Sequence, residues 1–200
     1  MNRLNRPAIS KSRKTTETDI QLCLCLDGRG KYDISTGSGF MDHMLELFTR
    51  HGAFDLSVTC NGDTHIDDHH SIEDIGIVLG QAFLEALGDS KGIKRYGHTI
   101  LPMDEALILT AVDLCGRSTL VMDVDIPCEK IGDFDTELVE EFLTAFAREV
   151  RGAIHVRQLA GKNCHHIVEG IFKSLARSLR EAVSVDDVFA EEIPSTKGLL

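Results

Sequence analysis

The same pattern of residues occurs twice in this chain, 96 positions apart, and this repeat restricts the fold more than any other feature. In the first copy, two histidines and a glutamate (His69, His70 and Glu73) open a stretch with apolar residues at helical spacing. In the second copy His165, His166 and Glu169 do the same, and the apolar stripes also match: Ile72, Ile75, Leu79, Phe83 and Ala86 against Val168, Ile171, Leu175, Leu179 and Ala182. Amphipathic helices resemble one another, but matching polar triplets as well indicate a duplicated unit.

The elements that the hydrophobic periodicity predicts follow one order in both halves. Alternating apolar residues from Ile20 to Leu26 are typical of a half-buried strand, and Asp27-Gly28 would start a hairpin. A helix over 42–51, a strand over 54–59 and a long helix over 69–87, ended by Gly88, follow. The second half predicts two strands joined by the turn "CGRS", a helix, a strand and a long helix, over 106–114, 119–126, 136–150, 153–158 and 165–183. Each half is therefore interpreted as a ββαβα unit.

We expect an α+β fold in which residues 1–200 form one domain built from two tandem repeats. The repeats cover roughly 13–92 and 93–185, and a C-terminal tail over 186–200 follows. In each half, two helices would cover one face of a sheet, and packing the helical faces together would bury both apolar stripes. The expected architecture is two mixed sheets that sandwich a central layer of four helices.

Composition excludes several classes of protein. The chain is 42% hydrophobic and 26% charged, which is typical of a globular protein, and no apolar run approaches the ~20 residues that span a bilayer. The net charge of −11 argues against a nucleic-acid surface. The basic N-terminus "MNRLNRPAISKSRK" lacks the apolar region of a secretory signal, so a cytoplasmic location is expected. The six cysteines contain no CxxC pair and are expected to be reduced thiols.

Imidazole and carboxylate groups gather at the start of each long helix, with a spacing that is typical of a metal site. Residues i and i+4 share a helix face, so the first histidine and the glutamate of each triplet can offer a nitrogen and an oxygen to one ion. The second histidine of each triplet points about 100° further round and can serve another ion. Mixed imidazole and carboxylate donors suit manganese, iron, zinc or nickel.

Other residues near the triplets are open to two interpretations. His43 and His155 are the natural residues to complete the ligand set, although either one alone would more often be a structural histidine. The loop before the first triplet, with His65, Asp63, Asp67 and Asp68, either orients the imidazoles or is a plain solvated loop. A single triplet would also be explained by favourable charge at a helix N-terminus, but two copies in one register favour metal binding.

The chain resembles the imidazoleglycerol-phosphate dehydratases of histidine biosynthesis in motifs that extend over about 13–198. These motifs are "GFMDHMLELFTRHGAFDL", "GDTHIDDHHSIEDIGI", "KGIKRYG", "MDEAL", "LAGKNCHHIVEGIFKSLARSLREA" and "PSTKG". Two departures are small: Met41 stands where leucine is more common, and Gly170 where alanine is common. The resemblance implies the monofunctional form, without the phosphatase domain that is fused to some bacterial versions.

The resemblance implies a metal cofactor and an assembly. Two Mn²⁺ ions per active site would be held by His43, His69, His70, Glu73, His155, His165, His166 and Glu169. The partner would be further copies of the same chain, in a homo-oligomer of 24 subunits with active sites between subunits, and neither nucleic acid nor membrane is expected.

The implied reaction converts D-erythro-imidazole-glycerol phosphate into imidazole-acetol phosphate. Metal ions at the two ring nitrogens would favour imidazolate, which can expel the C3 hydroxyl and leave a diazafulvene-like intermediate. Loss of the C2 proton then gives an enol that tautomerises to the ketone. Glu17 matches the acid/base glutamate of the family, supplied by a neighbouring subunit, and Asp104 or Asp42 would be a less favoured substitute. Glu73 and Glu169 are the other carboxylates expected at the reacting centre.

The resemblance also assigns the substrate contacts. Phosphate would be held by Arg95, Arg117, Lys173 and Lys197, with Ser195 and Thr196 as hydrogen-bond donors. The tail is therefore expected to order over the phosphate rather than fray. The remaining substrate contacts would be Glu17, His43, His51, His69, Glu73 and His165.

Two other functions stay open on the residues alone. Paired metals also activate water in phosphoesterases, although such sites usually rely on aspartate and asparagine. A metal-storing or metal-scaffolded cage would bind the ions without using an open coordination position.

Overall fold

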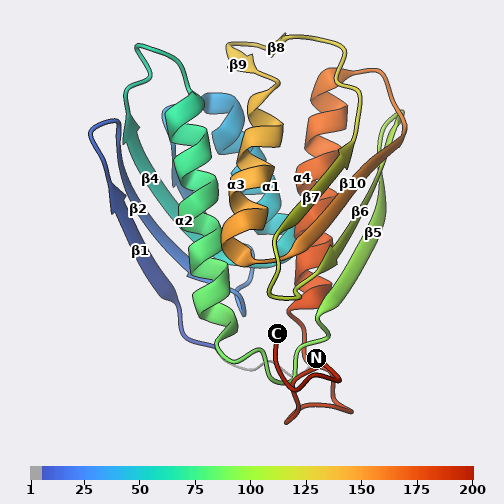
Figure 1. Ribbon diagram of the computed structural model, residues 1–200. Helices are drawn as coiled ribbons and strands as arrows, with labels where there is room; N and C mark the ends of the chain where they lie inside the picture. The colour runs from blue at the N-terminus through green and yellow to red at the C-terminus, as the bar shows by residue number, and fades with distance from the viewer. Residues whose placement is uncertain (1–5) are drawn as a thin grey trace.

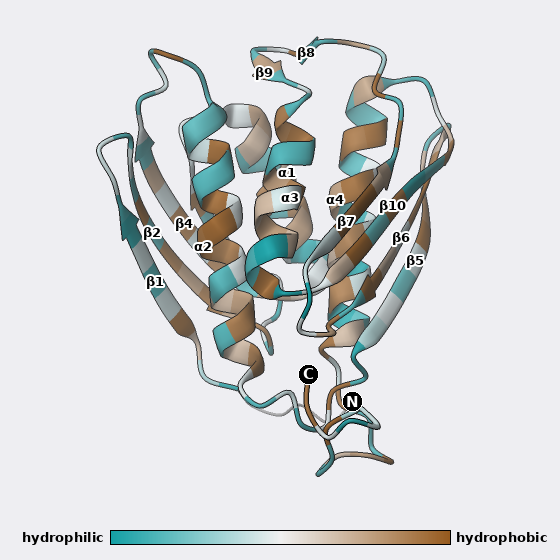
Figure 2. Ribbon diagram, in the orientation of Figure 1, coloured by the Kyte–Doolittle hydropathy of each residue, from teal (hydrophilic) through white to brown (hydrophobic). Residues whose placement is uncertain are grey.

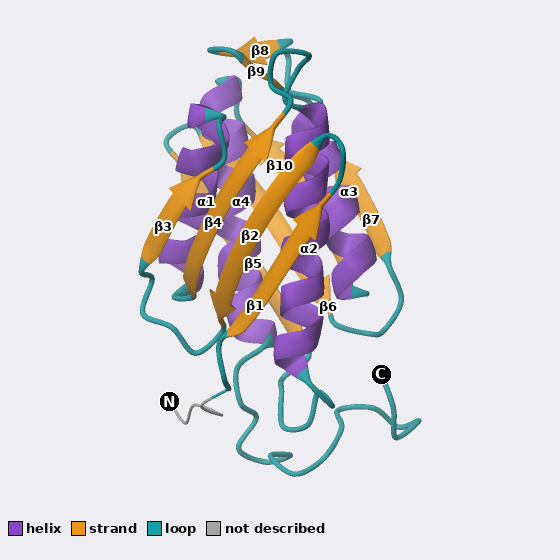
Figure 3. Cartoon of the chain, turned by 90° about the vertical axis from the view of Figure 1, so that its left-hand side faces the viewer, coloured by secondary structure: helices purple, strands orange, loops and turns teal. Residues whose placement is uncertain are grey.

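Two four-stranded sheets form the outer layers of the molecule, and four helices fill the space between them, as the computed structural model shows for residues 6–200 (Figure 1). The view from the side of the first sheet shows its strands crossing in front of the helices (Figure 3). The predicted α+β sandwich is confirmed.

The first sheet has the order β1-β2-β4-β3. Its strands are β1 (Ile9–Lys14), β2 (Thr18–Cys25), β3 (Tyr32–Ser35) and β4 (Asp55–Gly62). β2 is antiparallel to both neighbours, and β3 is parallel to β4, so the sheet is mixed. Alternate residues of β2 are buried against the helices, as the sequence predicts.

The second sheet repeats this arrangement in the order β5-β6-β10-β7. Its strands are β5 (Tyr96–Met103), β6 (Ala106–Asp113), β7 (Thr119–Asp123) and β10 (Ala153–Ala160). β6 is antiparallel to both neighbours and β7 is parallel to β10. A short ribbon of β8 (Lys130–Ile131) and β9 (Phe134–Asp135) precedes the third helix.

The central layer contains α1 (Gly39–Gly52), α2 (His69–Leu87), α3 (Leu138–Val150) and α4 (Cys164–Ala182). α2 packs against α3 and α1 against α4, so each pair joins one helix from each half. Every residue of the two predicted apolar stripes is buried. Apolar and polar segments alternate along the helices and strands (Figure 2). The core is thus shared between the halves, and the triplets stand at corresponding ends of α2 and α4 (Figure 1).

The structure corrects the predicted repeat unit. β1 and β5 precede the predicted strands, so each half is a βββαβα unit. Both are edge strands and lack a clear apolar alternation: β1 reads ISKSRK, and β5 contains Gly97 and Pro102. The predicted hairpin at Asp27-Gly28 is wrong, because β3 pairs with β4 rather than with β2. The turn "CGRS" likewise joins strands that are separated by β10.

Two further observations concern the cysteines and the membrane. Cys128 and Cys164 form a disulfide, with Cα atoms 6.4 Å apart, which corrects the expectation that all six cysteines are reduced thiols. The fold brings the connection after β7 to the start of α4, a proximity that cysteine spacing alone does not reveal. No helix within residues 6–200 combines the length and apolar character needed to cross a bilayer.

Candidate active site

Three of the predicted ligands converge where α1 packs against α4. One donor atom from each of His43, His165 and Glu169 lies within 4.8 Å of the others. His165 Nε2 is 3.1 Å from Glu169 Oε2, as the i, i+4 spacing predicts, and His43 Nε2 is 3.8 Å from the same oxygen. The rings of Phe40 and His165 meet edge to face, with centroids 5.4 Å apart. Among residues 6–200, this is the one group of three such donors.

The carboxylate at the centre of this cluster is buried and ionised. Only 6% of Glu169 is exposed. Burial opposes ionisation, but a hydrogen bond from Lys173 and its charge, together with His165, outweigh burial and lower the pKa of Glu169. Lys173 therefore neutralises Glu169 in this structure, and its predicted phosphate contact stays a prediction.

His51, the last residue but one of α1, faces the cationic side chains of Lys173 and Arg177 on α4. Burial lowers the pKa of His51, and the charges of Lys173 and Arg177 on α4 lower it further. The predicted substrate contact at His51 therefore lies beside the cluster, but its role is still a prediction.

The donor set fits a divalent transition metal. Two imidazoles and one ionised carboxylate, with no thiolate among them, suit manganese, iron, zinc or nickel. Three protein donors would leave coordination positions for other ligands, as a catalytic metal requires.

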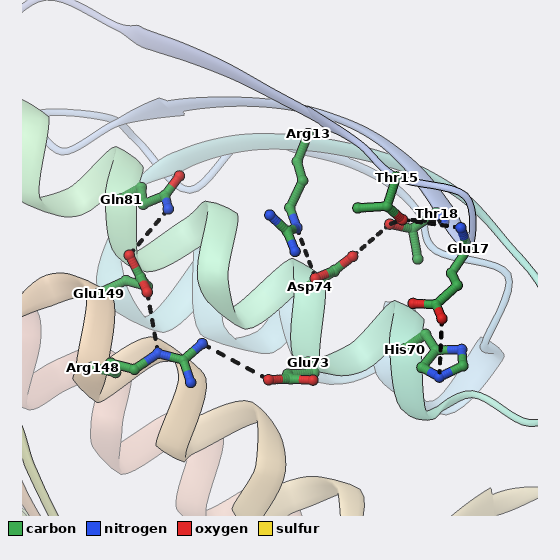
Figure 4. Close-up of polar contacts among 10 residues, drawn as sticks. All are labelled: Arg13, Thr15, Glu17, Thr18, His70, Glu73, Asp74, Gln81, Arg148 and Glu149. Atoms are coloured by element: carbon green, nitrogen blue, oxygen red, sulfur yellow. Dashed lines mark hydrogen bonds and ion pairs between the residues drawn. The ribbon is translucent and has the colours of Figure 1, made fainter.

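The first triplet, at the start of α2, is arranged differently (Figure 4). His70 Nδ1 is 3.0 Å from an Asp63 oxygen, and this hydrogen bond raises the pKa of His70. His70 Nε2 lies 3.8 Å from Glu17 in the β1–β2 turn. Glu73 turns toward Arg148 of α3, at 3.8 Å, so this glutamate is engaged by a helix of the other half (Figure 4). The sequence prediction that His69 and Glu73 share an ion stays a prediction.

Only some residues of the acidic loop before α2 contact the histidines that they were predicted to orient. Asp63 contacts His70, and Asp67 accepts a hydrogen bond from the backbone N–H of His69 at 2.9 Å. His65 is exposed. Of the loop residues, Asp63 best fits the predicted role of orienting an imidazole, because it contacts the ring of His70.

His166, the second histidine of the second triplet, contacts a carboxylate that sequence reasoning did not single out. Its Nδ1 lies 2.7 Å from Glu105 Oε2, and its Nε2 lies 3.7 Å from Asp104. The bond to Glu105 raises the pKa of His166. The same bond, with the backbone N–H groups of Asn163 and Lys162, lowers the pKa of Glu105 to about 2. The motif "MDEAL", which carried the resemblance, contains both carboxylates and was the available signal.

His155 is the predicted ligand that stands apart. It is exposed on β10, between Ala111 of β6 and Val121 of β7, whereas its neighbours Ile154 and Val156 point into the core. The side chain therefore lies on the outer face of the second sheet, and its predicted role as a ligand is not supported by proximity within one chain.

The predicted phosphate contacts other than Lys173 gather in a separate cavity of about 890 Å³. Arg95, Arg117 and the tail residues Ser195, Thr196 and Lys197 line it. Arg95 binds both oxygens of Asp113, at 2.6 and 3.1 Å, and donates to the Pro194 carbonyl at 3.0 Å. The Glu192 carbonyl accepts from the N–H of Gly92 at 2.9 Å. The tail therefore folds back over Arg95, and Arg117 and Lys197 add positive charge to the lining.

Comparison with known proteins identifies the family. The family model for imidazoleglycerol-phosphate dehydratase matches residues 36–179. Curated relatives with that name include one from Desulforamulus reducens, 58% identical over 98% of this chain and 100% of its own length, and one from Caldicellulosiruptor bescii, 56% identical over 94% and 95%. The chain belongs to the imidazoleglycerol-phosphate dehydratase family. It is therefore an enzyme of the lyase class.

Solved imidazoleglycerol-phosphate dehydratases share the fold. The enzyme from Staphylococcus aureus superposes with a TM-score of 0.83 at 40% identity and covers 90% of this chain. The enzyme from Pyrococcus furiosus gives 0.82 at 38% identity and covers 95%. Each is matched over 100% of its own chain.

The metal cluster and the phosphate cavity, the two parts expected in an imidazoleglycerol-phosphate dehydratase site, lie near opposite ends of helix α4. His165 lies in the first turn of α4, and the Ala182 carbonyl at the end of α4 accepts a hydrogen bond from the Arg95 N–H at 2.9 Å. A rise of 1.5 Å per residue puts about 26 Å between these ends. The tail lies at the bottom of Figure 1, below the far ends of α2 and α4.

Proposed function

We propose that this chain catalyses the metal-dependent dehydration of D-erythro-imidazole-glycerol phosphate to imidazole-acetol phosphate in histidine biosynthesis. Membership of the family supports the dehydratase activity. The observation that carries the metal dependence is the convergence of His43, His165 and Glu169 within 4.8 Å. The cytoplasmic location expected from the sequence stays a prediction.

The proposed cofactor is Mn²⁺, two ions per active site. His43, His165 and Glu169 would hold one ion, and the other predicted ligands, His69, His70, Glu73, His155 and His166, would complete the two metal sites. The bound metal would supply Lewis acidity that favours deprotonation of the substrate imidazole.

The residues of the chain would divide the remaining work. Arg117 and Lys197 would bind the phosphate, since both line the cavity under the tail. Deprotonation of the ring lets the C3 hydroxyl leave through a diazafulvene-like intermediate. Glu17, which lies 3.8 Å from His70, would take the C2 proton, and the resulting enol tautomerises to the ketone.

The active site is proposed to form between copies of the chain, in an assembly of 24 subunits. Five bonds of about 1.5 Å separate the imidazole ring of the substrate from its phosphorus, which is less than about 8 Å in all. The metal cluster and the phosphate cavity of one chain are about 26 Å apart. One substrate molecule cannot reach both, so the phosphate residues would come from another copy.

The test is turnover of imidazole-glycerol phosphate by protein stripped with a chelator and then reconstituted with Mn²⁺. We expect activity to disappear on chelation and to return with Mn²⁺. Glu169→Gln and Glu73→Gln should each lower kcat by about 100-fold or more, because each removes a proposed ligand. Glu85→Gln, which alters an exposed partner of Lys11, is the control and should keep parental activity.

Two results would contradict the proposal. Full activity in the chelated protein would remove the metal dependence. Two bound equivalents of Mn²⁺ without turnover would favour the metal-scaffolded cage instead.

A further inference from the structure

The second histidine of each triplet has the same pair of neighbours. Nδ1 of His70 lies 3.0 Å from Asp63, and Nδ1 of His166 lies 2.7 Å from Glu105. Nε2 of each ring faces a more distant carboxylate, Glu17 at 3.8 Å or Asp104 at 3.7 Å. In both halves this second carboxylate lies in the turn between the first two strands of the sheet.

The two contacts on Nδ1 come from different places in the sequence. Asp63 follows β4 and precedes His70 by only 7 residues, whereas Glu105 lies in the β5–β6 turn, 61 residues before His166. β2 and β6 begin 88 residues apart, at Thr18 and Ala106, so Glu105 corresponds to Glu17, which faces Nε2 of His70 and not Nδ1. β4 and β10 begin 98 residues apart, so Asp63 corresponds to Gly161. The duplication therefore did not copy this contact, and each half supplies its own carboxylate to the same ring nitrogen.

A carboxylate at Nδ1 determines what Nε2 can do. An ionised carboxylate only accepts hydrogen bonds, so Nδ1 must carry the proton of the neutral ring. Nε2 then presents its lone pair and is the atom that can bind a metal.

Glu105 is itself fixed at the start of α4. Its Oε1 accepts hydrogen bonds from the backbone N–H groups of Asn163 at 2.8 Å and Lys162 at 3.2 Å. Its Oε2 is left for His166, whose own N–H bonds the Asn163 side chain at 3.2 Å. The carboxylate is thus tied to the same turn of chain that carries His165 and His166.

We propose that Glu105 is a positioning residue that fixes the ring of His166 with Nε2 directed to the metal centre, as Asp63 does for His70. The inference rests on the proposed function, because the proposed metal centre supplies the ion that the Nε2 atoms of His70 and His166 would bind. Glu105 would act through His166 and would not touch the substrate.

The decisive variant is Glu105→Gln. The amide oxygen can still accept the two backbone N–H groups, but the amide N–H₂ then faces Nδ1 and forces its proton onto Nε2. Solid-state ¹⁵N NMR of the metal-free, histidine-labelled protein at pH 9 reads the tautomer, with His166→Gln to assign the signal. We expect the signal of His166 to change from the Nδ1–H to the Nε2–H form in Glu105→Gln, and to stay Nδ1–H in Glu105→Asp.

Binding of Mn²⁺, followed by the EPR signal of the free ion, is the second measurement. Glu105→Gln should weaken one class of site by about 10- to 100-fold, and Glu105→Asp should restore part of that loss. Asp63→Asn is the matched variant in the other half, and Glu85→Gln is the control. A purely structural role would lower the melting temperature without changing the tautomer.

An Nδ1–H tautomer in Glu105→Gln, or parental affinity for Mn²⁺, would overturn the positioning role. If the proposed metal centre itself is wrong, Glu169→Gln should bind Mn²⁺ as tightly as the parent does. That result is distinct from a failure of the positioning role of Glu105.

Discussion

Asp55 shows how a single carboxylate can hold a turn of this fold. It lies at the start of β4, and its Oδ1 accepts the backbone N–H groups of Arg29 at 2.7 Å and Lys31 at 2.9 Å. Burial opposes its ionisation, but these hydrogen bonds and the charge of Lys31 outweigh burial and lower the pKa of Asp55. The segment between β2 and β3 therefore depends on a charged side chain.

Asp55→Asn should make stability less dependent on pH. Because the pKa of Asp55 is lower in the folded state, its stabilisation is fully present above the unfolded-state pKa of about 4 and is lost as pH falls through the folded-state value. At pH 7 the substitution should lower the free energy of unfolding by about 1–2 kcal/mol. Urea unfolding at pH 7 and at successively lower pH should show the difference from the parent shrinking. A difference that stays constant would contradict the role of the charge.

At this scale the sequence predicts contacts within one element better than contacts between elements. The i, i+4 rule predicted the contact of His165 with Glu169. The same rule could not anticipate that Arg148, on another helix, approaches Glu73. Glu105 was missed because its partner lies 61 residues away and meets it only through the β5–β6 turn.

α2 and α3 approach each other closely at two glycines of α2. A Cβ on Gly76 would lie 2.7 Å from the Phe142 carbonyl oxygen, and one on Gly80 would lie 2.8 Å from the Phe146 oxygen and 2.7 Å from the Glu149 Cβ. The backbone of α3 cannot move away from such contacts cheaply. This close contact joins the two halves behind the triplets.

Gly80→Ala should destabilise the protein although alanine is the better helix former. Helix propensity favours alanine by about 1 kcal/mol, whereas overpacking costs about 1–3 kcal/mol. The expected net loss is about 1 kcal/mol, which lowers the melting temperature by about 2–4 °C for a chain of this size. The control is Gly39→Ala in α1, where no atom lies within 4 Å of the new Cβ, and which should melt at or above the parental temperature. An unchanged melting temperature in Gly80→Ala would contradict the packing argument.

The elements that were predicted best are those with long, regular apolar stripes. The range 69–87 for α2 is confirmed at both ends, and α4 differs from its prediction by one residue at each end. Edge strands were missed because only one face of them is partly covered, so their sequences need no apolar alternation. Strand order was misjudged because adjacency in sequence suggested hairpins, whereas β4 and β10 insert between their neighbours.

At the scale of the whole molecule, the two halves share a fold but not a complete site. His43 on α1 meets the second triplet on α4. The C-caps of α1 and α3, Ala53 and Arg151, are 98 residues apart, so the counterpart of His43 is the carboxylate Glu141 on α3, which packs beside α2. Within residues 6–200, however, the first triplet forms no three-donor group with α3 like the one that the second triplet forms with His43. Together with the distant phosphate cavity, this asymmetry supports the proposal that further copies of the chain complete the site.

Complementation between two inactive variants tests whether metal and phosphate residues of one site come from different copies of the chain. Glu169→Gln removes a metal ligand, and the double variant Arg117→Ala/Lys197→Ala removes phosphate contacts. Each alone should be nearly inactive, but co-expressed chains with different tags should form mixed assemblies. If metal and phosphate residues come from different copies, random mixing leaves both parts intact in about one quarter of the sites, so about one quarter of parental activity should return. A site within one chain would leave no site intact, and the mixed assemblies would then show no more activity than the two variants measured separately.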